Sequence, residues 1–210
     1  MATYEPRSDR KLLTSHEWLT FGWASLPENR IELSGETKEP LVVQYAGETA
    51  GFANALAEDG WKPAPEWSLT TASGFVVGQT PAEKLPALPR TQNGRQPALI
   101  LIKNDHMQDP QSSRWILRLW PSRYQVLHRG SLLPLYTGSV LHEEILRPMG
   151  EFSGPKIDRE EPALADNPAL LVDGAAARTR TDGTEVVLAL EPPASPVSSS
   201  DKPRANSRGR

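Results

Sequence analysis

Apolar residues recur with a period of two along the middle of the chain, and this pattern predicts β-strands. The stretch RWILRLW at 114–120 alternates between two faces. ALILIK at 98–103 is short and rich in branched residues, which is typical of a buried strand. We expect Pro121 and Ser122 to bend the chain out of the strand over 114–120. Further strands are predicted over 40–47, 124–128 and 135–144.

One helix is clearly predicted, over 48–59. Within it Phe52 and Leu56 are stacked four residues apart, and Gly60 is placed to end the helix. Nearer the N-terminus, Thr14 and Glu17 have the spacing of a capping box, which predicts a second, short helical segment. A further short helix is expected around 68–75. The segment after Thr14 ends at Pro27 and carries its apolar side chains on one face: Leu19, Trp23 and Leu26.

Turn signals and composition divide the remainder of the chain. Asp182 and Gly183 lie between two strand-like runs, which is a strong signal for a β-hairpin. Prolines punctuate residues 62–97, and residues 148–168 are predicted to form a long loop. From Glu191 onwards the chain has a single large aliphatic residue, so we expect 192–210 to be a disordered tail.

These elements together predict an α+β fold in a single domain. We expect a mostly antiparallel or mixed β-sheet with one clear helix and long proline-rich loops. The expected boundaries are a flexible N-terminus over 1–13, one domain over 14–191 and the disordered tail over 192–210.

Composition and charge exclude several classes of protein. The chain of 210 residues has a net charge of −3, so it lacks the basic footprint of a nucleic-acid-binding protein. It contains no cysteine, which excludes disulfides, thiolate zinc sites and cysteine nucleophiles. No signal-peptide pattern and no apolar run long enough to cross a membrane are present. We therefore expect a protein that is soluble or peripheral at a membrane.

The sequence carries no recognisable catalytic or cofactor motif, and we expect no cofactor and no metal. Asp105, His106 and Asp109 lie in a predicted turn, where acidic side chains bond their own backbone without needing a metal. The His142-Glu143-Glu144 run is interpreted as a solvated strand end. Ser139 lies within a strand pattern rather than at a strand-to-helix turn, which disfavours a hydrolase nucleophile.

The strand over 114–120 is unusual because it carries two arginines and two tryptophans. Alternation places Trp115, Leu117 and Leu119 on one face, which should belong to the core. The opposite face carries Arg114, Ile116, Arg118 and Trp120. We expect Trp120 to pack under the Arg118 side chain and the proline-rich connections, with cation–π contact between the two.

Two interpretations of these arginines remain open. In the first, each arginine has an internal partner and closes an apolar face, as buried arginines usually do. In the second, planar guanidinium groups bind a phosphate or a carboxylate. The candidate anion-binding residues are Arg114, Arg118, Arg123 and Lys103.

The stretch RWILRLWPS, followed later by PLYTGSV, resembles the LssY C-terminal domain family. The upstream stretches LPENRIEL, PLVVQYAG, LAEDGWKPAP and LPALPRTQNGRQPALILIK are similar to this family as well, so the resemblance covers roughly residues 18–190. The residues that match the family's recurring motifs are Arg118, Leu119, Trp120, Pro134, Leu135, Tyr136, Gly138 and Ser139.

The resemblance implies a bacterial membrane context, because in such proteins this domain follows a DedA-type region and a type 2 phosphatidic acid phosphatase region. This chain lacks the transmembrane helices and the phosphatase signature residues of that arrangement. It is therefore expected to be a stand-alone relative or a split or truncated frame. A membrane phosphatase or DedA-type protein encoded nearby is the partner that the resemblance implies.

Three functions are consistent with the sequence. The first is a non-catalytic accessory or binding domain of the LssY type. The second is a hydrolase that acts on a phosphate ester or another anionic substrate, with Arg118 as an anion clamp. The third is a general protein-interaction module. A cleft in which Arg118, Lys103 and a histidine converge would favour the hydrolase, and internal carboxylate partners for Arg118 would favour the other two.

Overall fold

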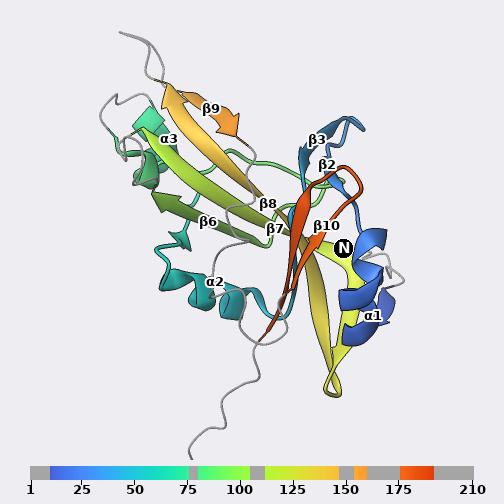
Figure 1. Ribbon diagram of the computed structural model, residues 1–210. Helices are drawn as coiled ribbons and strands as arrows, with labels where there is room; N and C mark the ends of the chain where they lie inside the picture. The colour runs from blue at the N-terminus through green and yellow to red at the C-terminus, as the bar shows by residue number, and fades with distance from the viewer. Residues whose placement is uncertain (1–9, 76–79, 105–111, 147–153, 160–175, 192–210) are drawn as a thin grey trace, which may run out of the picture.

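Two long antiparallel strands, β7 (Ser113–His128) and β8 (Ser131–Leu146), form the hairpin on which the fold is built (Figure 1). The computed structural model describes residues 10–75, 80–104, 112–146, 154–159 and 176–191. The hairpin is so long that each strand has different outer neighbours along its length. The first half of β7 pairs with β6, while its second half pairs with β1. The pairing of β8 likewise passes from β4 near its start to β9 near its end.

Within the described residues the sheet has nine strands, and its main path runs in the order β10-β11-β4-β8-β7-β6-β5. Pairings are antiparallel except for β1 with β7 and β11 with β4, so the predicted α+β fold with a mixed sheet is confirmed. The expected hairpin at Asp182 and Gly183 joins β10 to β11. The remaining strands are β1 (Lys11–Thr14), β4 (Val43–Ala46), β5 (Lys62–Pro63), β6 (Leu99–Asn104), β9 (Gly154–Arg159), β10 (Ala176–Thr179) and β11 (Glu185–Leu190).

The helical elements are short, and they follow the signals in the sequence. Thr14 caps α1 (Ser15–Thr20), because its hydroxyl accepts from the Glu17 amide at 3.2 Å while the Glu17 carboxylate accepts from the Thr14 amide at 2.7 Å. The clear helix prediction corresponds to α2 (Thr49–Ala57), which buries Phe52 and Leu56. The other elements are the 3-10 turns η1 (Gly22–Ser25), η2 (Ser73–Phe75) and η3 (Ala82–Lys84), helix α3 (Leu69–Ala72), and a separate hairpin of β2 (Asn29–Ile31) and β3 (Thr37–Pro40).

The two faces of the sheet have different covers. Helix α2 lies against one face, on a core that includes Leu101, Leu117 and Val140. The opposite face has two covers. One is the α1–η1 segment, whose Trp18 is fully buried. The other is a proline-containing connection, which we call the strap and define as residues 82–90; its Ala82, Leu85 and Ala87 are buried in two small clusters.

The alternation predicted for 114–120 is present in this arrangement. Leu117 and Leu119 belong to the core beneath α2, and the partly buried Trp115 packs against the same core. Trp120 lies on the opposite face and is fully buried beneath the strap, where its indole N–H donates to the Arg90 carbonyl at 3.3 Å. No cation–π contact between Arg118 and Trp120 is recorded among the described residues.

Several sequence-based boundaries differ from the structure. Pro121 does not end the strand, because β7 continues through an irregularity in its pairing with β8 between Pro121 and Gln125, and a proline is tolerated there. Residues 11–13 lie in β1, within the segment expected to be flexible. Strand β9 falls within the loop expected over 148–168. Near the N-terminus, the fully buried side chain is Trp18 rather than Leu19 or Trp23.

Candidate functional site

A buried ion cluster joins the two strands of the central hairpin. Arg114 and Arg118 extend from β7 to the same carboxylate, that of Glu143 on β8. The Arg114 Nη2 atom lies 3.1 Å from Glu143 Oε2, and the Arg118 Nη2 atom lies 3.5 Å from Glu143 Oε1. All three side chains have an exposed fraction of 0%. This cluster supplies the internal carboxylate partner that one interpretation of these arginines required.

The strap completes the surroundings of the two guanidinium groups with backbone carbonyls. Arg114 donates to the carbonyls of Ala82 at 2.7 Å, of Pro86 at 3.2 Å and of Leu85. Arg118 donates to the Leu88 carbonyl at 3.2 Å. Two cations therefore share one carboxylate, and the carbonyl dipoles of the strap provide additional negative partial charge.

Burial weakens the hold of these guanidinium groups on their protons. It lowers the pKa of the Arg118 guanidinium to about 10, although the charge of Glu143 opposes this shift. Arg118 is therefore still a cation near neutral pH. Its Nε and Nη1 atoms have no hydrogen-bond partner within the described part of the chain, and the same holds for the buried Ser139 hydroxyl opposite Arg118 on β8.

The interpretation of 142–144 as a solvated strand end was wrong. His142 is 2% exposed and Glu143 is 0% exposed, and only Glu144 is partly open to solvent. The cause is sheet position, because β8 lies between β7 and β9 at this point rather than at an edge. The His142 ring meets the Trp115 ring edge-on, with centroids 4.8 Å apart, on the face opposite Glu143.

A second charged group fixes the strap to the β2–β3 hairpin. Glu39 accepts from Arg90 at 2.8 Å and lies 2.8 Å from the Nε atom of Arg30. Burial raises the pKa of Glu39, but the hydrogen bond from Arg30 and the charge of Arg90 outweigh it and hold the pKa below its ordinary value. The Arg30 guanidinium also reaches the Thr91 carbonyl at 2.8 Å, directly after the strap.

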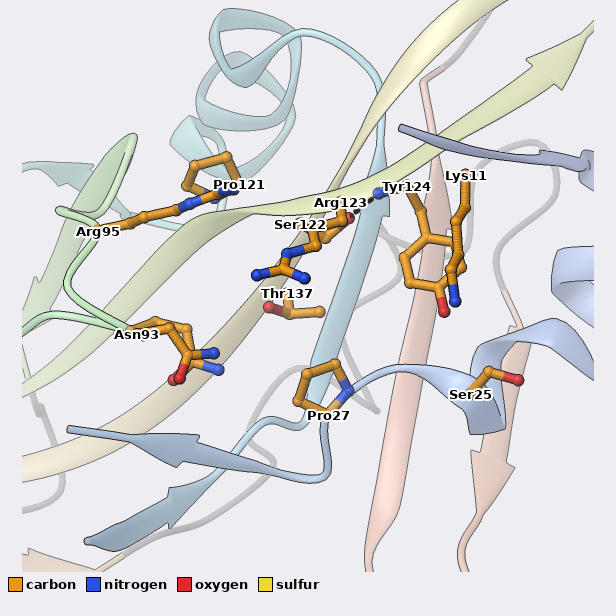
Figure 2. A pocket seen from close by; sticks show the side chains of 11 residues that line it. Lys11, Ser25, Pro27, Asn93, Arg95, Pro121, Ser122, Arg123, Tyr124 and Thr137 are labelled. Carbon is orange, nitrogen blue, oxygen red and sulfur yellow. Dashed lines mark hydrogen bonds between the residues drawn. The ribbon is translucent and has the colours of Figure 1, made fainter. Parts of the chain in front are cut away.

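An open cleft of about 590 Å³ lies on the same face of the sheet as the strap. Its walls come from both covers of that face, with Ser25 and Pro27 from the end of the α1–η1 segment and Asn93 from beyond the strap (Figure 2). Thr137 of β8 lies between these walls. The irregular part of β7 and strand β1 complete the lining with Pro121, Ser122, Arg123, Tyr124 and Lys11.

The charged residues that are known to line the cleft, within the described part of the chain, are all positive. Lys11, Arg95 and Arg123 line it, and no acidic side chain of the described residues does. All three are exposed, and within the described part of the chain no ion pair is recorded for any of them. Figure 2 shows the Arg123 guanidinium turned into the cleft above Thr137. The Lys11 Nζ atom lies 5.6 Å from the centroid of the Tyr124 ring.

The structure does not gather the four predicted anion-binding residues into one site. Arg114 and Arg118 belong to the buried cluster, whereas Arg123 lines the cleft. Lys103 pairs in register with Trp115 on the face that α2 covers, and its amine donates to Asp59 at 2.7 Å. The candidate metal turn at 105–109 lies outside the described residues, and no potential metal-binding cluster occurs within them.

Sequence reasoning missed most of the cleft, including Lys11 and Arg95. These residues come from separate segments, and none stands in a motif of its own. The one local signal was the proline at 121, which marks the irregular stretch of β7 but was interpreted as the end of a strand.

The residues of the two recurring motifs lie side by side in the central hairpin. Arg118 pairs in register with Ser139, and Leu119 pairs with Gly138. A Cβ atom at Gly138 would lie 2.5 Å from the Arg118 carbonyl oxygen, so only glycine fits this position without a shift of the backbone. The rest of the second motif packs inward: Leu135 is buried, and the Tyr136 ring lies 6.5 Å from the ring of Tyr45.

Comparison with known proteins identifies the family of the chain. No curated protein and no solved structure matched the chain. Among the described residues, no helix combines the length and the apolar character needed to cross a membrane. A family model described as the LssY C-terminus matches residues 23–160, which is more than half of the chain and includes both motifs of the central hairpin. The chain therefore belongs to the LssY C-terminus family.

Proposed function

We propose that this chain is a non-catalytic accessory or binding domain that works beside membrane lipid phosphatases or DedA-type proteins in bacteria. Family membership supports the domain type, and the family's usual arrangement next to such regions motivates the partner. A general protein-interaction module would use the same fold, and it differs only in the identity of its partner.

The observation that carries this proposal is the buried Arg114–Glu143–Arg118 cluster. An anion clamp for catalysis has to be reached by its substrate, yet both arginines have an exposed fraction of 0% and share an internal carboxylate. Removing an ion pair of this kind from water costs free energy. Hydrogen bonds that join β7, β8 and the strap offset this cost. The arginines are thus best explained as structural residues.

The hydrolase remains the second candidate because of one specific observation. The Nε and Nη1 donors of Arg118 and the Ser139 hydroxyl are buried without hydrogen-bond partners among the described residues. Buried polar groups in this state call for an explanation, and an oxyanion that enters after the strap moves would provide one.

A turnover assay separates the two candidates. We expect the purified chain to release no product from p-nitrophenyl phosphate or p-nitrophenyl acetate, because Arg118 and Ser139, the groups that the hydrolase would use, are fully buried. Ser15 and His128 form a half-buried contact, with Oγ and Nδ1 3.1 Å apart, but neither residue lines the cleft. Turnover that disappears in Ser139→Ala and in Arg118→Lys would instead establish the hydrolase.

The accessory role requires its own test. We expect the tagged chain to co-purify with a membrane phosphatase or DedA-type protein encoded beside it when both are expressed together. Absence of both the neighbouring frame and the co-purification would contradict the accessory role.

A further inference from the structure

We infer that the cleft between the α1–η1 segment and the end of the strap binds the phosphate group of a phosphate monoester. Arg123, Arg95 and Lys11 would provide the positive charge. This inference goes beyond the accessory role and is independent of it, because a domain can bind such a ligand with or without catalysing its hydrolysis.

The balance of charges in the cleft is the first support. Among the described residues, three cations and no carboxylate line it, although the chain as a whole carries a net charge of −3. The contrast with the arginines around the strap is informative, since Arg30, Arg90, Arg114 and Arg118 all have acidic partners. Like charges that line one open space repel each other, and an anion would relieve this repulsion.

The chemistry of the lining favours phosphate over carboxylate. Guanidinium groups make two parallel hydrogen bonds to phosphate oxygens, and the ammonium group of Lys11 acts as an additional point charge. A phosphate monoester carries close to two negative charges near neutral pH, which suits three cations better than the single charge of a carboxylate. The hydroxyl groups of Ser25 and Thr137 and the amide of Asn93 add neutral hydrogen-bonding partners.

The size and the walls of the cleft indicate that the phosphate carries an organic group. A volume of about 590 Å³ is in the usual range for ligand sites and is far more than a phosphate ion alone would fill. The Tyr124 ring and the two prolines, Pro27 and Pro121, provide apolar wall beside the charged groups. A mixed lining of this kind is typical of a site that holds both parts of an ester.

The fold explains why the cleft occurs at this place. The strap covers the sheet above Arg118, and the α1–η1 segment covers it around Trp18 and Leu135. Thr137 lies on β8 between Ser139 and Leu135, where one cover ends and the other begins. The irregular pairing of β7 at this level places Arg123 beside the gap between the covers. The cleft is therefore a product of the architecture rather than of one flexible loop.

The experiment is a titration of the full chain with phenyl phosphate, with benzoate as the carboxylate control. We expect saturable binding of phenyl phosphate that weakens with added salt. The double variant Arg95→Gln/Arg123→Gln should bind at least about tenfold more weakly, because two charge-assisted hydrogen-bonding groups are lost. Lys84→Gln removes one positive charge from an exposed position in η3 that does not line the cleft, and it should bind like the unmodified chain.

The pH dependence provides a second readout. The second pKa of a phosphate monoester is about 6, so affinity for phenyl phosphate should rise as the pH increases through this value. The lining residues that the structure describes include no histidine and no carboxylate that would titrate in the same range. Affinity for benzoate, which is already fully ionised there, should stay constant.

Vesicles distinguish the two sources of such a phosphate. If the natural ligand is a lipid, phosphatidylcholine vesicles that contain phosphatidic acid should bind the chain, and phenyl phosphate should compete. If it is a soluble ester, the vesicles should not bind while phenyl phosphate does. The inference is overturned if neither probe binds, if the double variant binds as well as the unmodified chain, or if Lys84→Gln weakens binding equally.

Binding and turnover remain separable in these experiments. Phenyl phosphate that binds without being hydrolysed supports both the cleft and the non-catalytic role. Hydrolysis of bound phenyl phosphate would contradict the non-catalytic role alone, and failure to bind would contradict the cleft alone.

Discussion

At the scale of single residues, Glu143 has a larger role than either arginine that it contacts. It is the only acidic side chain recorded in an ion pair with Arg114 or Arg118 within the described residues. Loss of one arginine leaves Glu143 paired with the other, whereas loss of Glu143 leaves two buried guanidinium groups with carbonyl acceptors alone. The cost of a substitution should therefore depend on which member of the cluster is removed.

We expect Arg118→Ala to lower the free energy of unfolding by about 1–3 kcal/mol, and Arg118→Lys by less. Lysine keeps the charge and most of the aliphatic stem but loses the planar fork. Glu143→Ala should cost more, about 3–5 kcal/mol, because it strands buried charge. Denaturant unfolding of the three variants checks this order, and equal stability of Arg118→Ala and the unmodified chain would refute it.

A second residue-scale prediction concerns two neighbours on β8. Gly138→Ala should destabilise the chain by roughly 1–3 kcal/mol, because the new methyl group meets the backbone of β7. Ser139→Ala removes a buried hydroxyl that has no hydrogen-bond partner among the described residues, so it should be neutral or slightly stabilising. The pair is compared by thermal unfolding. A Gly138→Ala variant as stable as Ser139→Ala would show that the strands separate easily.

At the scale of elements, sequence-based prediction succeeded where the local pattern of residues alone decides the structure of a segment. The strand over 98–103, helix α2 and the capping box of α1 are of this kind. Local pattern failed where a distant partner decides the structure. Lys11–Thr14 become a strand because they pair with the far half of β7, and Glu143 is buried because β9 lies beside β8. The periodicity of a short segment does not reveal which distant strand it pairs with.

The strap depends on Glu39 in a way that pH should reveal. The pKa of Glu39 is lower in the folded chain than its ordinary value of 4.5, so its stabilising contribution is present above that value and is lost as the pH falls through the lower, folded pKa. We expect Glu39→Gln to be less stable than the unmodified chain near neutral pH, with a difference that shrinks below about pH 4.5. Urea unfolding over this range is the measurement. A constant difference would show that Glu39 is not coupled to Arg30 and Arg90 through its charge.

At the scale of the whole molecule, the fold class could be predicted from the sequence but the cleft could not. The period-two pattern and the family motifs describe the central hairpin, because those residues are neighbours in sequence or in register. The lining of the cleft combines Lys11, Arg95 and Arg123, which come together only when β1, the segment that follows the strap and the irregular part of β7 take their places. Of these three residues, the sequence indicates only Arg123 as a candidate anion-binding residue, because it lies close to the strand over 114–120.

The C-terminal end provides a test of where the domain stops. The predicted tail over 192–210 lies outside the described residues, whereas the Glu191 carboxylate accepts from the Glu48 amide at 3.0 Å, at the start of α2. We expect deletion of 192–210 to change the Tm by less than about 2 °C. Glu191→Ala should lower the Tm further, because it removes an anion from a helix N-terminus. A large decrease for the deletion alone would show that the tail packs against the domain.

The division between structural and ligand-binding arginines is tested most directly by the affinity of Arg118→Lys for phenyl phosphate. If Arg118 belongs only to the buried cluster, this variant should show reduced stability and should bind the ester as the unmodified chain does. The opposite result, an unchanged free energy of unfolding together with loss of binding, would contradict this assignment and place Arg118 in the site.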